Sequence, residues 1–139
     1  MPGKSIQVPS ENSIPLWVKA AVILCVVLTG AGAVIAFVNP GMLVQPHAEI
    51  TPAVRTYAGY LTSRNAVLAI VLLMLLVSRA YRALGNLLAI VGLIQVLDCV
   101  IDCTEARWTV APGVLVLGII FLVSASRLCG PLWKRDAWI

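Results

Sequence analysis

Long apolar runs alternate with short polar segments along this chain. Four apolar runs cover about residues 15–38, 52–78, 83–104 and 111–128 of the 139 residues. Each run reaches or approaches the roughly 20 residues that an α-helix needs to cross the hydrocarbon core of a bilayer. The pattern therefore predicts an all-α protein, a left-handed antiparallel four-helix transmembrane bundle formed by residues 14–129.

Helix-start and helix-stop signals separate the runs. Asn39-Pro40-Gly41 follows the first run, and Thr51-Pro52 supplies a capping residue and a first-turn proline for the second. Arg79, Tyr81 and Arg82 mark the turn before the third run, and Pro112 opens the fourth. Residues 1–13 are expected to form a polar tail and residues 130–139 a short second tail, which leaves no room for a separate soluble domain.

The composition supports the membrane assignment. Hydrophobic residues make up 60% of the chain and charged residues 12%, whereas charged residues are about a quarter of an ordinary soluble domain. The net charge of +4 comes from Lys and Arg scattered along helix ends. Because these residues do not form one basic patch, we expect no nucleic-acid partner. The sequence predicts an integral, multi-pass protein of a plasma or inner membrane, or of an endomembrane in a eukaryote, with the lipid bilayer as its surroundings.

Basic residues also predict the orientation in the membrane. With four spans, both termini share a side with the middle turn, and the basic residues expected on that side are Lys4, Lys19, Arg79, Arg82, Arg127, Lys134 and Arg135. The opposite side has only Arg55 and Arg107, with Arg64 inside the bundle. By the positive-inside rule we expect both termini to be cytoplasmic.

Polar residues within the second and third runs lie on one face of each helix. At spacings of three and four residues, these faces comprise Tyr57, Tyr60 and Arg64 on the second helix and Gln95, Asp98, Asp102 and Glu105 on the third. At a rise of about 1.5 Å per residue from the turn, Arg64 and Asp98 reach nearly the same height. Since charges at membrane depth are costly, we expect a buried salt bridge between Arg64 and Asp98. The two faces are then opposite walls of one polar pocket, lined by Tyr60, Arg64, Gln95, Asp98 and Asp102.

This pocket predicts acid–base chemistry on a small lipophilic molecule. Asp98 and Asp102 lie one turn apart and repel, so one carboxyl can hold a proton while the other is ionised. Arg64 would hold the ionised carboxylate or bind an oxyanion, and Tyr60 would donate a hydrogen bond to a substrate oxygen. The expected catalytic residues are thus Asp98, Asp102, Arg64 and Tyr60, and the expected substrate-binding residues are Tyr57, Asn65, Gln95 and Glu105. An isomerase, hydrolase or cyclase of this kind requires no cofactor, and no metal site is expected.

Other interpretations remain open, and whether the protein is an enzyme is among the open questions. Arg64 and Asp98 could be a structural pair that fixes the register of two helices, while Tyr57 and Tyr60 anchor the membrane interface. A proton-coupled or small-molecule transporter would have to be an oligomer, because one four-helix copy has no inverted repeat. An accessory subunit of a membrane complex is the third class.

Small residues on the first helix indicate a close helix contact. Gly30, Gly32 and Ala36 form a face where another helix can approach, and we expect packing inside the bundle rather than between two copies. A homodimer stays open as an alternative.

Certain short elements resemble a known family. The four-span layout, the Asn39-Pro40-Gly41 break, Ser63-Arg64-Asn65 and Gln95-Val96-Leu97-Asp98 resemble the small DoxX-like membrane proteins over roughly residues 38–128. The most similar groups are bacterial and fungal ones that carry only a domain-of-unknown-function label. The resemblance implies a compact four-helix membrane bundle, and for some fungal relatives a place beside natural-product genes, but no settled reaction. Named DoxX members are subunits linked to quinone-coupled sulfur oxidation, and no cysteine or haem-type motif here carries that chemistry across.

Overall fold

Four α-helices and one short 3-10 helix form the structure, a computed structural model that describes residues 14–44 and 49–132. The helices are α1 (Leu16–Val38), α2 (Pro52–Val77), α3 (Tyr81–Thr104) and α4 (Ala111–Cys129), and the 3-10 helix η1 (Pro40–Leu43) follows α1. All four α-helices are long and apolar enough to cross a membrane. The prediction of an all-helical protein with four helices able to cross a membrane is confirmed for the described residues.

The turn between α2 and α3 is tighter than the sequence indicates. The backbone N–H of Ala80 donates to the carbonyl of Leu75 at 3.0 Å, and that of Arg79 donates to the carbonyl of Leu76 at 3.2 Å. With Arg79 in the left-handed region at φ 56°, these bonds form a Schellman motif. Because this motif reverses the chain within a few residues, α3 begins at Tyr81 rather than at residue 83.

The start of α2 follows the capping signal of the sequence. The hydroxyl of Thr51 accepts a hydrogen bond from the backbone N–H of Val54 at 3.3 Å, and Pro52 occupies the first helical position. The side-chain cap therefore satisfies one of the free N–H groups of the first turn.

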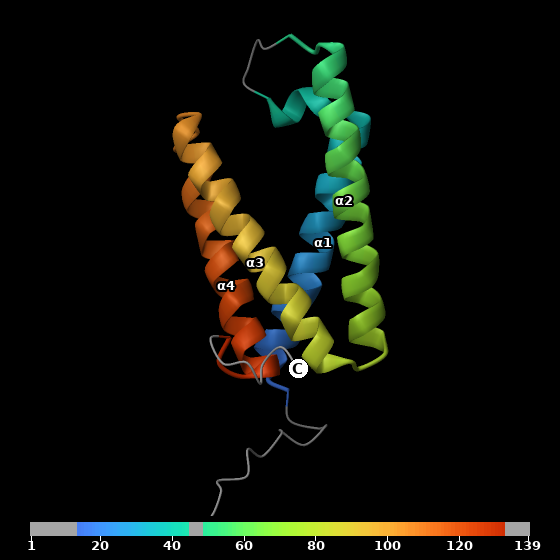
Figure 1. Cartoon of the computed structure of the whole chain (residues 1–139), viewed down its shortest axis with the longest axis vertical. Helices are drawn as coiled ribbons and strands as arrows, with labels where there is room; N and C mark the ends of the chain where they lie inside the picture. Colours follow the sequence, from blue (N-terminus) through green and yellow to red (C-terminus); the bar gives the residue numbers. More distant parts are fainter. Residues whose placement is uncertain (1–13, 45–48, 133–139) are drawn as a thin grey trace, which may run out of the picture.

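The helices pair into two hairpins. α1 packs along α2, and α3 packs along α4, while contacts between the two pairs are much fewer. Figure 1 shows the α2–α3 turn at one end and both other connections at the opposite end, toward which the hairpins diverge. We call the end with the α2–α3 turn the closed end and the opposite end the open end.

The hydrophobic core occupies the closed-end half, where all four helices meet. Its buried members are Val22, Cys25, Leu72, Leu84, Leu88, Ala89, Val91, Phe121 and Ala125. A nearby apolar hollow of about 10 Å³, lined by Val18, Leu76, Tyr81 and neighbouring side chains, is large enough for no more than a single water molecule. The polar half and the packed apolar half of the bundle thus lie at opposite ends.

Glycines allow α3 and α4 to approach closely. A Cβ atom on Gly92 would lie 2.8 Å from Cγ of Leu122 and 3.1 Å from the carbonyl oxygen of Gly118. A Cβ on Gly85 would lie 2.8 Å from Cβ of Leu128 and 3.3 Å from the carbonyl oxygen of Ala125. Backbone-to-backbone packing of this kind is typical of helix contacts in membranes.

The close-approach face predicted on α1 is formed in part. Gly32 lies against α2, where its added Cβ would meet the side-chain nitrogen of Asn65 at 3.0 Å, and Ala36 is buried. Gly30, by contrast, has open space around it, so it does not take part. The hydroxyl of Thr62 adds a hydrogen bond to the carbonyl of Ala33 at 3.3 Å, which ties α2 to α1.

Candidate functional site

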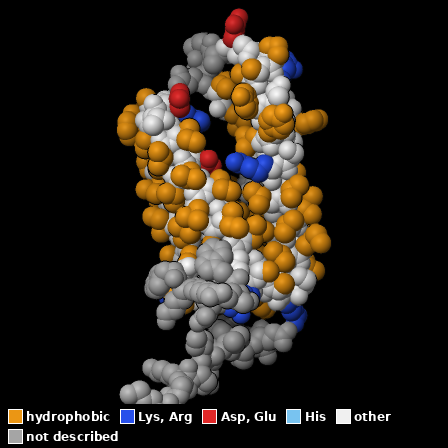
Figure 2. All heavy atoms as spheres, in the orientation of Figure 1, with side chains coloured by type: hydrophobic (Ala, Val, Ile, Leu, Met, Phe, Trp, Pro, Cys, Tyr) orange, Lys and Arg blue, Asp and Glu red, His pale blue; other side chains and the backbone are white. Residues whose placement is uncertain are grey.

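The candidate site is the space between the two hairpins at the open end. Figure 2 shows the molecule hollowed there, with acidic side chains on the side of α3 and a basic group on the side of α2. Divergence of the hairpins, rather than a gap in a packed core, produces this hollow. We refer to it as the cleft.

One face of α3 runs from the core into the cleft. At spacings of three and four residues, this face carries Leu84, Leu88 and Val91 in the core and then Gln95, Asp98 and Asp102. The same stripe that packs the closed end therefore becomes polar where the hairpins separate.

Arg64 and Asp98 lie on opposite sides of the cleft. Arg64 is exposed, Asp98 is half-buried, and their charges are close enough to interact. Within the described residues, however, neither forms a salt bridge, so the expected Arg64–Asp98 pair is wrong as a direct contact. The physical reason is the divergence of the hairpins, because α2 and α3 make few contacts with each other.

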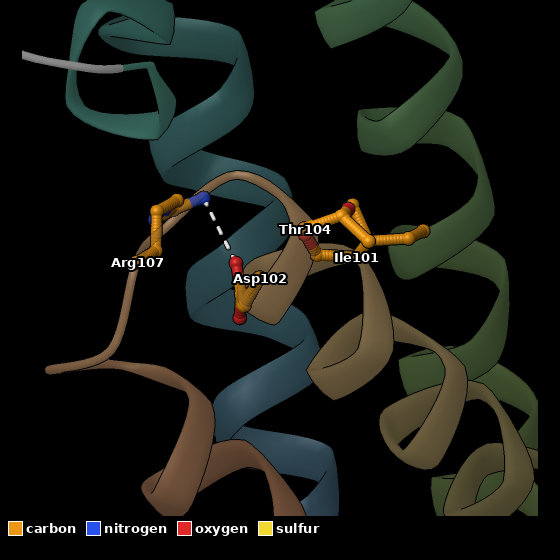
Figure 3. Close-up of polar contacts among 4 residues, drawn as sticks. All are labelled: Ile101, Asp102, Thr104 and Arg107. Atoms are coloured by element: carbon orange, nitrogen blue, oxygen red, sulfur yellow. Dashed lines mark hydrogen bonds and ion pairs between the residues drawn. The ribbon is translucent and has the colours of Figure 1, made fainter.

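The salt bridge at the open end joins Asp102 to Arg107 instead. Nη1 of Arg107 lies 3.2 Å from Oδ1 of Asp102, as Figure 3 shows. Asp102 is buried, with only 7% of its surface exposed, whereas the Arg107 side chain is 37% exposed. A carboxyl group this buried needs a partner of opposite charge, and Arg107 supplies that partner for Asp102.

A Schellman motif at the end of α3 places Arg107 over Asp102. The backbone N–H of Arg107 donates to the carbonyl of Asp102 at 2.8 Å, and that of Ala106 donates to the carbonyl of Cys103 at 3.3 Å. Ala106 takes the left-handed conformation at φ 56°. A hydrophobic contact usually accompanies this motif, and here the salt bridge takes its place.

Sequence reasoning missed this pair because its usual signal is absent. Glycine or asparagine normally marks the left-handed position of a Schellman motif, and this chain has Ala106 there. The remaining signal is an acid and a base five positions apart across a helix end, Asp102 and Arg107. That spacing does not bring two side chains together in a continuous helix, so it indicates a pair only once the turn is known.

Two of the expected substrate-binding residues pack within the hairpins. Cβ of Gln95 would lie 3.3 Å from a Cβ on Gly118, so the stem of Gln95 rests on α4. The side-chain amide of Asn65 rests on Gly32 of α1. Both side chains are half-buried and help to hold the helix pairs together.

Three other predicted residues lie on the surface. Tyr57 and Tyr60 are 72% and 67% exposed, and their rings form an edge-to-face pair with centroids 6.5 Å apart. Glu105 is exposed and caps the C-terminal end of α3. Among the residues that the structure describes, Tyr60 and Arg64 are exposed, so the expected enclosed pocket of Tyr60, Arg64, Gln95, Asp98 and Asp102 is not seen. The catalytic and binding roles given to these residues stay predictions.

Metal-ligating side chains do not gather into groups of three or more within residues 14–44 and 49–132. The single histidine of the chain, His47, lies outside the described residues.

Comparisons with protein-family models, with curated proteins and with solved structures found no match for this chain. The resemblance to DoxX-like proteins gains no support from them and stays a prediction.

Proposed function

We propose that this multi-pass membrane protein binds a small amphiphilic molecule in the cleft, with the polar head of the ligand between Arg64 and Asp98. The observation that carries the proposal is the state of Arg64. Its guanidinium is exposed and has no salt bridge to any described residue, yet the side chain belongs to the middle of a membrane-spanning helix.

The position of Arg64 along α2 makes a guanidinium without a salt bridge to any described residue energetically costly. Arg64 is 12 residues from Pro52 and 13 from Val77, so about 18–20 Å of helix lies on either side of it. Insertion scales give a cost of about 2.5–3.5 kcal/mol for an arginine at the centre of a membrane helix. Such residues usually face a cavity or a partner group, and Arg64 of α2 lies near enough to Asp98 of α3 for their charges to interact.

The proposal includes an antiparallel bundle with both termini in the cytoplasm. Contacts between α3 and α4 support it, because Gly85 meets Ala125 while Gly92 meets Gly118. Basic residues support the orientation: the closed end has Lys19, Arg79, Arg82 and Arg127. In this orientation the cleft opens away from the cytoplasm.

Acid–base chemistry on the bound molecule is a second candidate, and the Asp102–Arg107 salt bridge favours it. That pair engages one of two neighbouring carboxyl groups, Asp102, whereas Asp98 has no salt bridge to any described residue. Two carboxyl groups in different environments are the arrangement that general acid and base catalysis uses. In this candidate function Asp98 is the group that exchanges a proton with the ligand.

Native mass spectrometry of the protein purified in mild detergent tests the binding proposal. We expect the wild type to retain an amphiphile and both Arg64→Gln and Asp98→Asn to lose it. Arg55→Gln is the matched control, since Arg55 is an exposed arginine of the same helix near its open end, and it should retain the ligand. Equal occupancy in all four folded proteins would sink the proposal and move the accessory-subunit interpretation to the front.

A further inference from the structure

The charges of Arg64, Asp98, Asp102 and Arg107 sum to zero, but only two of these four side chains neutralise each other by direct contact. Asp102 and Arg107 neutralise each other in their salt bridge. Arg64 and Asp98 supply one positive and one negative group without a direct partner among the described residues. α1 and α4 add no charge beside them, because their charged residues, Lys19 and Arg127, lie toward the closed end.

The charges of Arg64 and Asp98 together favour a ligand head that carries both a negative and a positive group. A ligand head with only a negative group would bind Arg64 but would be repelled by Asp98 and would leave that carboxylate unsatisfied. A head with only a positive group would bind Asp98 but would be repelled by Arg64 and would leave that guanidinium unsatisfied. In a site of low dielectric constant, each unsatisfied or repelled charge costs more than it would in water.

The shape of the bundle decides where the apolar part of the ligand goes. Leu72 and Leu88 are fully buried at the closed end, so an acyl chain cannot continue downward into the core. The hairpins diverge, and the cleft between them is open on the face seen in Figure 2. A tail therefore leaves sideways into the surrounding lipid, while the head stays between α2 and α3.

We infer that the ligand is a zwitterionic amphiphile of zero net charge, whose anionic group binds Arg64 and whose cationic group binds Asp98. A phospholipid head that carries an ammonium group on its phosphate has this chemistry. The inference depends on the proposed binding function and specifies its ligand class.

Lipids with identical tails and different heads test the ligand class. Phosphatidylethanolamine, phosphatidylglycerol and a lipid with a quaternary ammonium head would each be titrated into the delipidated protein and the bound lipid followed by native mass spectrometry. We expect the wild type to bind phosphatidylethanolamine at least about tenfold more tightly than either other lipid, which is the range of one hydrogen bond to a charged group.

Variants of Arg64 and Asp98 test the two expected contacts with the ligand head one at a time. Asp98→Asn should remove the preference over phosphatidylglycerol, and Arg64→Gln should remove the preference over the quaternary ammonium lipid. Arg64→Lys keeps the positive charge and should keep most of the binding, whereas Arg55→Gln should behave as wild type. Soluble phosphoethanolamine, which lacks tails, should compete weakly if the ligand is a lipid. Equal competition would identify a soluble source of the same chemistry.

The outcomes distinguish the two proposals. If the wild type binds phosphatidylglycerol or the quaternary ammonium lipid as tightly as phosphatidylethanolamine, but still through Arg64 and Asp98, the zwitterion inference fails and the binding function stands. If no lipid binds in a manner that depends on Arg64 or Asp98, both fail.

Discussion

Among the described residues, two that are not glycine adopt the left-handed backbone conformation, and both lie at the C-terminal ends of helices. Arg79 follows α2 and Ala106 follows α3, each at φ 56°. An L-residue with a Cβ atom is disfavoured there by roughly 1–2 kcal/mol, a cost that glycine avoids. The chain therefore keeps two tight turns at some loss of stability.

Replacement of Ala106 by glycine should stabilise the protein. We expect the free energy of unfolding to rise by about 1 kcal/mol, because the left-handed position is relieved and the Schellman hydrogen bonds remain. Ala83→Gly is the matched control: Ala83 is exposed in the first turn of α3, and glycine there should lower the free energy by about 0.5–1 kcal/mol. Unfolding in a denaturing detergent, followed by circular dichroism, measures both. Destabilisation by Ala106→Gly would contradict the turn geometry.

At the scale of single residues, the sequence predicts the features that depend only on neighbouring residues in the chain. The Thr51 cap and Pro52 are recognisable because each acts through the chain next to it. The Asp102–Arg107 pair is not recognisable, since it exists only because Ala106 takes a conformation that its side chain disfavours. Arg64 and Asp98 were expected to lie at similar positions along the bundle and to form a direct contact. They do not form this contact, because residue spacing along each helix does not determine the distance between the two helices.

At the scale of the helices, small residues decide which pairs pack closely. Gly85, Gly92 and Cys99 are buried at intervals of seven on α3, and Ala111, Gly118 and Ala125 are buried at the same interval on α4. Because contacts of Gly85 and Gly92 are made with α4 backbone, these two helices form the tightest pair. The close contact expected from Gly30 and Gly32 lies on α1, whereas this longer series on α3 and α4 was not predicted, although its seven-residue period is readable in the sequence.

Gly92→Ala should therefore separate α3 from α4. The added methyl group would meet Leu122 at 2.8 Å and the carbonyl of Gly118 at 3.1 Å, so we expect a loss of about 1–3 kcal/mol in the free energy of unfolding. Gly59→Ala is the control within α2, because nothing lies within 4 Å of its added Cβ. There the change should stabilise by about 0.5–1 kcal/mol in the same detergent titration. Equal effects of the two changes would show that close packing of α3 on α4 is not what Gly92 provides.

At the scale of the molecule, the two hairpins share a core at the closed end and separate toward the open end (Figure 1). Helix number, helix bounds and the apolar closed end follow from hydrophobic runs, which the sequence displays directly. The separation does not follow from them, because it results from the balance between packing within hairpins and packing between them. It is also the basis of the proposed function, since it replaces an expected enclosed pocket with an open cleft that has Arg64 and Asp98 on its two sides.

A double-mutant cycle at Arg64 and Asp98 tests this central claim most directly. Arg64→Gln, Asp98→Asn and the double variant would be compared with the wild type in two ways: free energy of unfolding after delipidation, and retention of the amphiphile. Since the two side chains do not touch, we predict a coupling in stability below about 0.5 kcal/mol, together with loss of the ligand in each single variant. A coupling of about 1–3 kcal/mol in the ligand-free protein, with ligand retention unchanged, would show instead that Arg64 and Asp98 are a structural ion pair.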